Sequence, residues 1–430
     1  MAIAFHRRAF VGVLLSTAAT LATAQWAPTP APLPSATPES LGLSSARLQR
    51  IGGWLQGEVD AQRIPGAVVM VLRDGKLAYV ASVGRQDPAQ PKPMARDSIF
   101  RIYSMTKPLV SVATLMLAEE GKLLLEAPVS RYIPSFAHTK VGVEKTDSAG
   151  NKTLELVPQA RPMTVHDLLR HTSGLTYGFF GNSLVKKAYV DAGVGISGDF
   201  TTAEFAEKLA ALPLHYQPGS TWDYSYSTDV LGRVLEVATG ESLSSLLGRR
   251  LFGPLGMRDT SFYVPEPARQ ARLAEPLPDD RTIGVGAVMG DPRKVEKFES
   301  GGGGLVSTAD DYARFAQMLL NGGVLDGRRY LSPATIAYMT SDHLAGVART
   351  PLYLPGAGYG FGLGFAVRTS AGDAPFVSPV GEYNWGGAGG TAYWADPKHR
   401  LATIFMMQSP KQRVPYRSVL RNMVYAAVEK

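Results

Sequence analysis

The segment AVVMVLRDGKLAYVASV, residues 67–83, decides the fold class of this chain. It contains two β-rich apolar runs, 67–72 and 77–83, on either side of Asp74-Gly75. An Asp-Gly pair between two such runs is typical of a tight turn that joins antiparallel strands. The segment therefore predicts a β-hairpin near the start of the folded chain.

A second pair of apolar runs lies near the C-terminus, at 390–394 and 401–407. The intervening residues 395–398, Ala-Asp-Pro-Lys, have the composition of a turn. Residues 359–367 are also strand-like, with alternating glycines. Antiparallel hairpins at both ends of the chain argue against a doubly wound parallel sheet.

The middle of the chain is richer in helical patterns, which are separated by loops that contain Gly and Pro. We expect helices at 107–120, 165–170, 202–212, 230–239 and 243–251, and two more at 44–63, with Ser44 as a possible N-cap, and 418–429. The predicted fold is α/β (α+β): an antiparallel sheet flanked by helices, with an inserted and mostly helical domain. The sheet domain is assigned to 44–99 and 291–430, and the helical domain to 100–290.

The composition is that of an ordinary globular protein: of 430 residues, 45% are hydrophobic and 19% are charged. This excludes a disordered chain, a collagen and a coiled coil. The absence of cysteine excludes disulfides, thiolate nucleophiles, cysteine-ligated metal centres and a lipoprotein anchor. The formal net charge of +7 comes from scattered basic residues with no run of three, so no nucleic-acid partner is expected.

The N-terminus has the pattern of a targeting segment. Arg7 and Arg8 precede an apolar stretch at 9–22, and Ala-Thr-Ala at 22–24 fits a signal-peptidase site. We predict a signal peptide over 1–24 and a periplasmic or secreted protein, with a retained N-terminal anchor as the alternative. The arginine pair resembles a twin-arginine signal, although ordinary Sec export stays open.

Residues 25–43 are expected to form a proline-rich linker, because residues 27–38 contain five prolines and almost no charge. No later stretch has 18 consecutive apolar residues, so no membrane span is expected.

The first motif that could carry out catalysis is Ser104-Met105-Thr106-Lys107, at the expected start of an apolar helix. Residues three apart share a helix face, so Lys107 can accept the proton that Ser104 must lose to become a nucleophile. The helix N-terminus also offers free N–H groups to a developing oxyanion. The alternative is a helix-capping Ser104 with a solvent-facing Lys107.

Two further motifs could complete such a site. Tyr224, in Tyr-Ser-Tyr-Ser, can act as a general base if a lysine lies nearby, or it can be an ordinary buried tyrosine. The glycine-rich WGGAGG at 385–390 can bring backbone N–H groups close to a ligand, or it can form a tight turn. No G-x-S-x-G, H-E-x-x-H or Walker motif occurs, and the histidine spacing does not predict a metal site. No cofactor is expected.

Taken together, in order and spacing, these motifs resemble the serine β-lactamase and penicillin-binding superfamily. The resemblance is strongest to class C β-lactamase-like serine hydrolases, and among these to the family VIII carboxylesterases. It runs from about Ser44 to the C-terminus and rests on 100–108 (FRIYSMTKP), 168–175 (LLRHTSGL), 224–232 (YSYSTDVLG), 302–311 (GGGLVSTADD) and 385–387 (WGG).

The resemblance implies roles for individual residues. Ser104 would be the acylated nucleophile, Lys107 its proton acceptor or polariser, and Tyr224 the general base and acid. The N–H groups of Ser104 and Ala388 would form the oxyanion hole. Which of Lys107 and Tyr224 takes the serine proton stays open, and His171 would be structural.

Two departures from the family pattern bear on substrate. Tyr226 stands where β-lactamases carry an asparagine that binds an acylamino group, and Trp385 stands where they carry a lysine that binds a carboxylate. Losing one such charged hydrogen bond costs ~1.5–3 kcal/mol of recognition. Tyr226, Trp385, Gly386 and Gly387 are the predicted substrate contacts, and uncharged small-molecule esters are the expected substrates.

The sequence thus predicts an exported serine hydrolase that cleaves carboxylic esters through an acyl-enzyme. The alternatives are a β-lactamase, a D-amino-acid peptidase or an acyltransferase of the same fold, and a penicillin-binding-like module that acylates without turnover. Acyl length, physiological substrate and oligomeric state are not predicted.

Overall fold

The computed structural model describes residues 31–283 and 287–430. Its largest sheet has seven strands in the order β13-β14-β15-β16-β17-β1-β2, and all neighbouring strands are antiparallel. The strands are β1 (Gly66–Arg73), β2 (Lys76–Gly84), β13 (Tyr359–Phe361), β14 (Ala366–Arg368), β15 (Tyr383–Gly386), β16 (Ala392–Asp396) and β17 (Leu401–Met407). The predicted antiparallel sheet assembled from both ends of the chain is confirmed.

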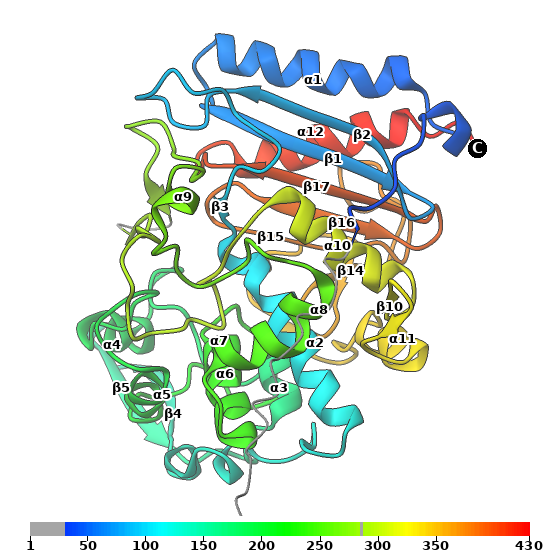
Figure 1. Cartoon of the computed structure of the whole chain (residues 1–430). Coiled ribbons are helices and arrows are strands. Elements are labelled where there is room, and N and C mark those ends of the chain that lie inside the picture. Colours follow the sequence, from blue (N-terminus) through cyan, green and yellow to red (C-terminus); the bar gives the residue numbers. More distant parts are fainter. Residues whose placement is uncertain (1–30, 284–286) are drawn as a thin grey trace, which may run out of the picture.

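The hairpin β1–β2 turns at Asp74 and Gly75, which both have positive φ angles, of 54° and 76°. Its first strand is buried along its whole length, because helices cover both faces of the sheet. On one face lie α1 (Ser45–Asp60) and α12 (Arg413–Ala426), and on the other lies α10 (Ala309–Leu320) (Figure 1). Alternate residues of β1 therefore enter two separate hydrophobic clusters.

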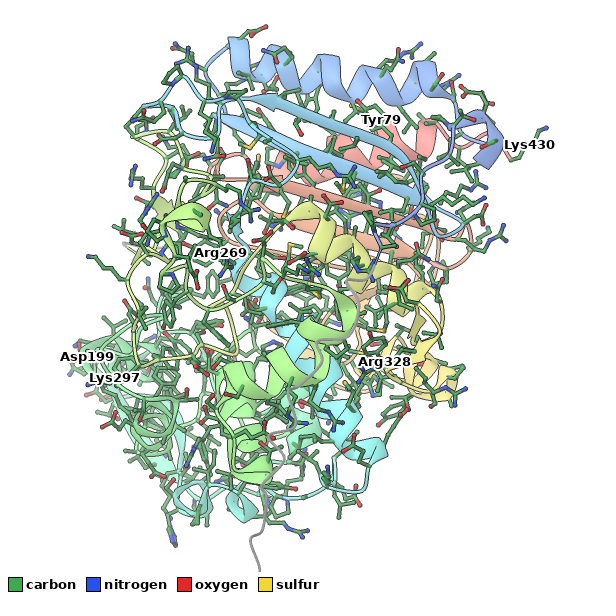
Figure 2. The ribbon with its side chains drawn as sticks, in the orientation of Figure 1. Tyr79, Asp199, Arg269, Lys297, Arg328 and Lys430 are labelled. Carbon is green, nitrogen blue, oxygen red and sulfur yellow. The ribbon has the colours of Figure 1, made fainter. Side chains whose placement is uncertain are left out.

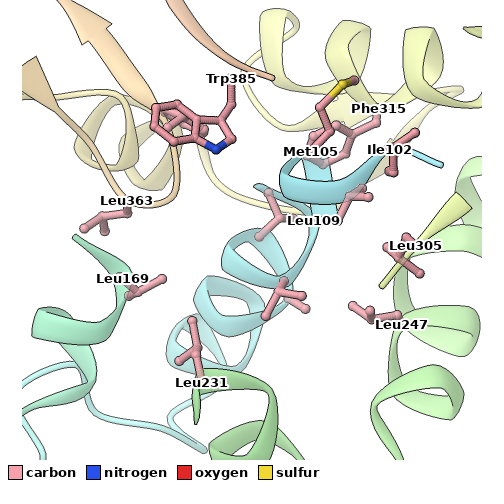
Figure 3. Close-up of a cluster of buried hydrophobic side chains, with 14 of the residues drawn as sticks. Ile102, Met105, Leu109, Leu169, Leu231, Leu247, Leu305, Phe315, Leu363 and Trp385 are labelled. Atoms are coloured by element: carbon pink, nitrogen blue, oxygen red, sulfur yellow. The ribbon is translucent and has the colours of Figure 1, made fainter. Parts of the chain in front are cut away.

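The helical region lies beyond α10 and surrounds α2 (Thr106–Glu119), which is buried over almost its whole length (Figure 1). Its other helices are α3 (Val165–Leu169), α4 (Leu184–Asp191), α5 (Thr202–Ala210), α6 (Ser227–Thr239), α7 (Leu243–Leu247), a π turn at Gly248–Phe252, α8 (Gly253–Leu255) and α9 (Pro267–Gln270). Leu109 of α2 lies in one cluster with Leu231 of α6 and Leu247 of α7, and Trp385 of the sheet lies above the N-terminal end of α2 (Figure 3). Charged pairs such as Lys297–Asp199, at 3.0 Å, lie on the outside (Figure 2).

The helical region is not purely helical. It contains a two-stranded sheet of β4 (Val141–Thr146) and β5 (Lys152–Val157), which the sequence patterns did not predict. Four shorter strand pairs also occur among the described residues: β3 (Phe100–Arg101) with β9 (Val306–Ser307), β6 (Thr221–Trp222) with β12 (Ala348–Arg349), β7 (Thr282–Ile283) with β8 (Ala287–Val288), and β10 (Val324–Leu325) with β11 (Arg328–Arg329). The helix α11 (Pro333–Met339) follows β11. Because β6 and β12 come from the two predicted domains, the two regions share main-chain hydrogen bonds.

The chain before α1 differs from its prediction. Of the expected linker at 25–43, the part from residue 31 is described, and there it belongs to the folded body. Leu77 of β2 donates its N–H to the Pro34 carbonyl at 2.7 Å and accepts from the Ala36 N–H at 3.1 Å. The extended backbone that proline favours is suited to such an edge contact. The predicted signal peptide at 1–24 lies outside the described residues.

No helix among the described residues is both long and apolar enough to cross a bilayer.

Candidate active site

Ser104 lies in a short 3-10 turn, Tyr103–Met105, that leads directly into α2. The residue before it, Tyr103, has a φ of +43°, a left-handed conformation that costs a non-glycine residue ~1–2 kcal/mol. The Lys107 Nζ then lies 3.4 Å from the Ser104 Oγ. The structure therefore brings the predicted nucleophile and its predicted proton acceptor together.

Lys107 is fully buried, so the alternative of a solvent-facing lysine is wrong. Its amine donates to the Gly302 carbonyl at 2.7 Å and to the Tyr177 hydroxyl at 3.2 Å. These bonds fix the side chain toward Ser104. Sequence reasoning missed Tyr177, although it follows the LLRHTSGL segment by only two residues.

The loop that supplies the Gly302 carbonyl is itself held by Asp229. The Asp229 Oδ1 accepts from the Ser300 hydroxyl at 2.5 Å and from the Gly302 N–H at 3.0 Å. A Cβ at position 302 would lie 2.4 Å from the Asp229 Oδ2, which explains the glycine. Burial raises the pKa of Asp229, while Lys107 and these hydrogen bonds act in the opposite direction. Asp229 thus positions Lys107 through one loop.

Tyr224 lies against the amine of Lys107, whose Nζ is 4.6 Å from the centre of the tyrosine ring. The Tyr224 hydroxyl accepts a hydrogen bond of 3.3 Å from the Trp385 Nε1. Within the described residues it has no direct hydrogen bond to Ser104 or Lys107. Catalytic hydrogen bonds often tighten only once substrate is bound, so this geometry is compatible with proton transfer.

His171 packs on the ring of Tyr224, with the ring centres 4.9 Å apart. Burial, and secondarily Lys107, lowers the pKa of His171 well below its usual range. Its Nδ1 lies 3.3 Å from the Ser225 Oγ, and it has no hydrogen bond to Ser104. This arrangement matches the structural role expected for His171.

The glycine-rich motif forms the end of β15 and the turn after it. A Cβ at Gly387 would lie 2.3 Å from the Ile102 carbonyl oxygen, so only glycine allows the turn to approach the Ser104 segment this closely. The Gly387 N–H donates to the Thr391 carbonyl at 2.9 Å, which closes the turn. Ala388, the second predicted oxyanion donor, therefore lines the same cavity as Ser104.

That cavity has a volume of about 280 Å³. Ser104, Tyr224, Trp385, Gly386, Gly387 and Ala388 line it, together with Phe180, Leu354, Phe376, Arg413 and Arg417, which sequence reasoning missed. The structure does not bring Tyr226 to this cavity. Tyr226 is buried, its ring packs on Tyr177 at 4.3 Å, and its hydroxyl donates to the Val194 carbonyl at 3.1 Å. Its side chain supports the wall of the site and does not face the cavity.

This chain is similar to known proteins over most of its length. The model of the beta-lactamase family matches residues 51–427. The chain belongs to this family. This confirms both the resemblance found in the sequence and the β-lactamase fold.

Two proteins of known sequence illustrate the similarity. Protein Rv1367c of Mycobacterium tuberculosis is 38% identical over 356 residues, which cover 81% of this chain and 87% of that protein. Esterase EstB of Burkholderia gladioli is 31% identical over 91% of this chain and 99% of the esterase.

Among solved structures, EstCE1, described as a hydrolase with promiscuous acyltransferase activity, has a TM-score of 0.72 and 28% identity over 91% of this chain and 99% of its own. This beta-lactamase-fold serine hydrolase is therefore related to esterases and acyltransferases.

Proposed function

We propose that this chain is an exported carboxylesterase that works through an acyl-enzyme on Ser104. The observation that carries the proposal is the 3.4 Å contact between the Ser104 Oγ and the buried Lys107 Nζ, in a cavity that Tyr224 and the glycine turn also line. A serine hydroxyl beside a buried amine and facing free N–H groups is equipped for nucleophilic attack on a carbonyl.

The reaction proceeds in two steps. The Ser104 Oγ attacks the ester carbonyl carbon, and its proton passes to the pair formed by Lys107 and Tyr224. The N–H groups of Ser104 and Ala388 stabilise the negative charge on the carbonyl oxygen. The bond to the alcohol breaks, and the alcohol leaves with the transferred proton. Water then attacks the acyl-enzyme, releases the carboxylic acid and restores the Ser104 hydroxyl.

Similar proteins support an ester as the substrate class. Besides EstB, a lovastatin esterase of Penicillium rubens is 29% identical over 82% of this chain. Acyl transfer to an alcohol is a second candidate, because EstCE1 is described with that promiscuous activity. The two reactions share the acyl-enzyme and differ only in whether water or an alcohol accepts the acyl group.

The test uses the chain from Gln25 onward and its Ser104→Ala variant, assayed with p-nitrophenyl esters of rising acyl length and with a chromogenic cephalosporin. We expect kcat/KM for esters to fall at least 10³-fold in the variant, because the attacking atom is gone. The matched control is Ser148→Ala, an exposed serine in the β4–β5 turn, which should leave the rate unchanged. Mass spectrometry should find the acyl group on the Ser104 peptide.

Four results would contradict the proposal. Full ester turnover by Ser104→Ala would remove the nucleophile assignment. Cephalosporin turnover above ester turnover would favour a β-lactamase. A stable Ser104 adduct without product release would favour a binding module. An added alcohol that yields a new ester faster than water yields acid would favour the acyltransferase.

A further inference from the structure

The C-terminal helix places three arginines, Arg413, Arg417 and Arg421, along the proposed ester site. Arg413 and Arg417 lie one turn apart in the first part of α12, and both line the cavity that contains Ser104. The sequence patterns predicted this helix only from residue 418, so both side chains were missed. The helix begins earlier because Pro415 falls in its first turn, where a missing N–H leaves no helical bond unmade.

Neither Arg413 nor Arg417 forms an ion pair with a described residue. Burial lowers the pKa of Arg413, and the charge of Asp280 acts in the opposite direction. Among residues 31–283 and 287–430, no carboxylate oxygen lies within 4.0 Å of a guanidinium nitrogen of Arg413 or Arg417. Arg421, one turn further along, is different because it pairs with the buried Glu382 at 3.2 Å. No Asp or Glu is among the described residues that line the cavity. The described lining of the cavity therefore contains positive charges and no negative one.

The Arg417 guanidinium lies directly against the glycine-rich motif. A Cβ at Gly386 would lie 2.3 Å from the Arg417 Cζ, so the glycine leaves the space that the guanidinium occupies. The Arg417 Nη2 donates to the carbonyls of Gly387 and Thr391 at 2.8 and 2.9 Å. These contacts hold the cation beside the turn that carries Ala388, one of the two proposed oxyanion donors.

Part of this guanidinium has no partner. The Arg417 Nε is buried without a hydrogen bond, and the Nη1 donates no hydrogen bond to any described residue. Burial, together with the charges of Arg413 and Arg421, lowers the pKa of Arg417 to about 9. A bound anion would offset the cost of burying the charged guanidinium beside two other arginines, because an opposite charge favours the protonated form of Arg417.

We propose that Arg413 and Arg417 form an anion subsite, and that the preferred substrates are esters that carry a carboxylate. This inference rests on the proposed ester hydrolysis and replaces the expectation of uncharged esters. That expectation was drawn from Tyr226 and from Trp385. Trp385 stands where related enzymes carry a lysine, but here the cations come from α12. The apolar side chains of Phe180, Leu354 and Phe376, on the same cavity, suit the hydrocarbon between the carboxylate and the ester.

The test compares charged and neutral esters of the same size. One pair, the mono-4-nitrophenyl ester of glutaric acid and its methyl ester, places the carboxylate on the acyl side. A second pair, 5-butyryloxy-2-nitrobenzoic acid and its methyl ester, places it on the alcohol side. We expect kcat/KM to favour the charged member of one pair by tenfold or more. The preference should fall as NaCl rises from 0.05 to 0.5 M, because salt screens the attraction.

The informative variant is Arg413→Gln, because Arg417 also holds the Gly387 turn. We expect the charged-to-neutral ratio of kcat/KM to fall about tenfold, mainly through a higher KM for the charged ester. The control Arg400→Gln removes an arginine whose side chain is 72% exposed and remote from the cavity, and should keep the wild-type ratio. Equal rates within both pairs for the wild type, or an unchanged ratio in Arg413→Gln, would overturn the subsite.

A binding measurement separates this inference from the proposed function. Glutarate should raise the melting temperature of the wild type and of Ser104→Ala, but not that of Arg413→Gln. If no ester is hydrolysed and glutarate still gives this pattern, the ester function fails and the anion subsite stands. If neutral esters are hydrolysed through Ser104 and glutarate stabilises no variant, the subsite fails and the ester function stands.

Discussion

At the scale of single residues, the site depends on close backbone approaches as much as on its functional side chains. Tyr103 holds a left-handed conformation immediately before Ser104, and Gly387 lies close against the Ile102 carbonyl. Asp229 fixes the carbonyl that orients Lys107. The position of Ser104 relative to the Ala388 N–H therefore depends on Tyr103 and Gly387, which take no part in the proposed reaction.

Gly387→Ala should impair the proposed oxyanion hole. The new methyl group would lie 2.3 Å from a backbone oxygen that cannot rotate away, so the turn that carries Ala388 must move from Ser104. We expect kcat for ester hydrolysis to fall ~10²-fold, the lower range for loss of one oxyanion donor. Steady-state kinetics would measure it. Gly372→Ala is the control, because a Cβ there meets nothing within 4 Å, and a similar loss in both variants would refute the geometric explanation.

The sequence predicted the site residues whose motifs are local. Ser104 and Lys107 are three positions apart, and at that spacing a helix places both side chains on one face, where the lysine can accept the serine proton. Arg417 could not be predicted, because its contact with Gly387 spans 30 positions and depends on where α12 begins. Tyr226 was assigned to substrate because it stands where related enzymes carry an asparagine that binds an acylamino group, but in the structure its ring packs on Tyr177 instead of facing the cavity.

At the scale of elements, α10 joins the sheet to the helical region through a buried carboxyl group. The Asp311 Oδ2 accepts from the Asp259 N–H and the Thr260 hydroxyl, both at 2.8 Å, so the first turn of α10 holds the chain after α8. Burial raises the pKa of Asp311 to about 7. The folded protein therefore keeps a proton on Asp311 between about pH 4 and 7, where the unfolded chain has lost it.

This proton makes stability depend on pH. Because the native state binds more protons in this window, Asp311 causes the free energy of unfolding to fall as pH rises, by up to ~1.4 kcal/mol per pH unit. In Asp311→Asn that slope should be missing, as measured by urea unfolding from pH 4 to 8. Asp310→Asn, at a neighbouring side chain that is 40% exposed, should keep the wild-type slope. A wild-type slope in Asp311→Asn would contradict the assignment.

At the scale of the whole molecule, the two ends of the folded body are joined to each other. Leu43 pairs with Val428, the Glu429 N–H donates to the Gly42 carbonyl at 3.0 Å, and Arg73 of β1 donates to the Lys430 carbonyl. The sequence predicted that both ends share one sheet, because each carries a hairpin. It could not predict this pairing, because hydrogen bonds between backbone atoms do not require particular side chains and so produce no recognisable sequence pattern.

Removing residues 428–430 should lower stability without altering the active site. The deletion breaks these backbone contacts, and we expect the free energy of unfolding to fall by ~1–3 kcal/mol in urea titrations. Ester turnover at 25 °C should be retained, because the cavity lies elsewhere. Lys430→Ala keeps the backbone contacts and should match the wild type. Equal stability of the deleted and full-length chains would show that the joined ends contribute nothing.

The strand order has a consequence for the order of events during synthesis. β17 lies between β16 and β1, yet it is the last strand to leave the ribosome. Until residues 401–407 emerge, the β1–β2 hairpin has an open edge, and two of the three helices that cover its faces, α10 and α12, are also encoded late. The nascent chain must therefore carry an unfinished sheet for more than 300 residues, and the sheet is completed only when β17 is inserted between β16 and β1.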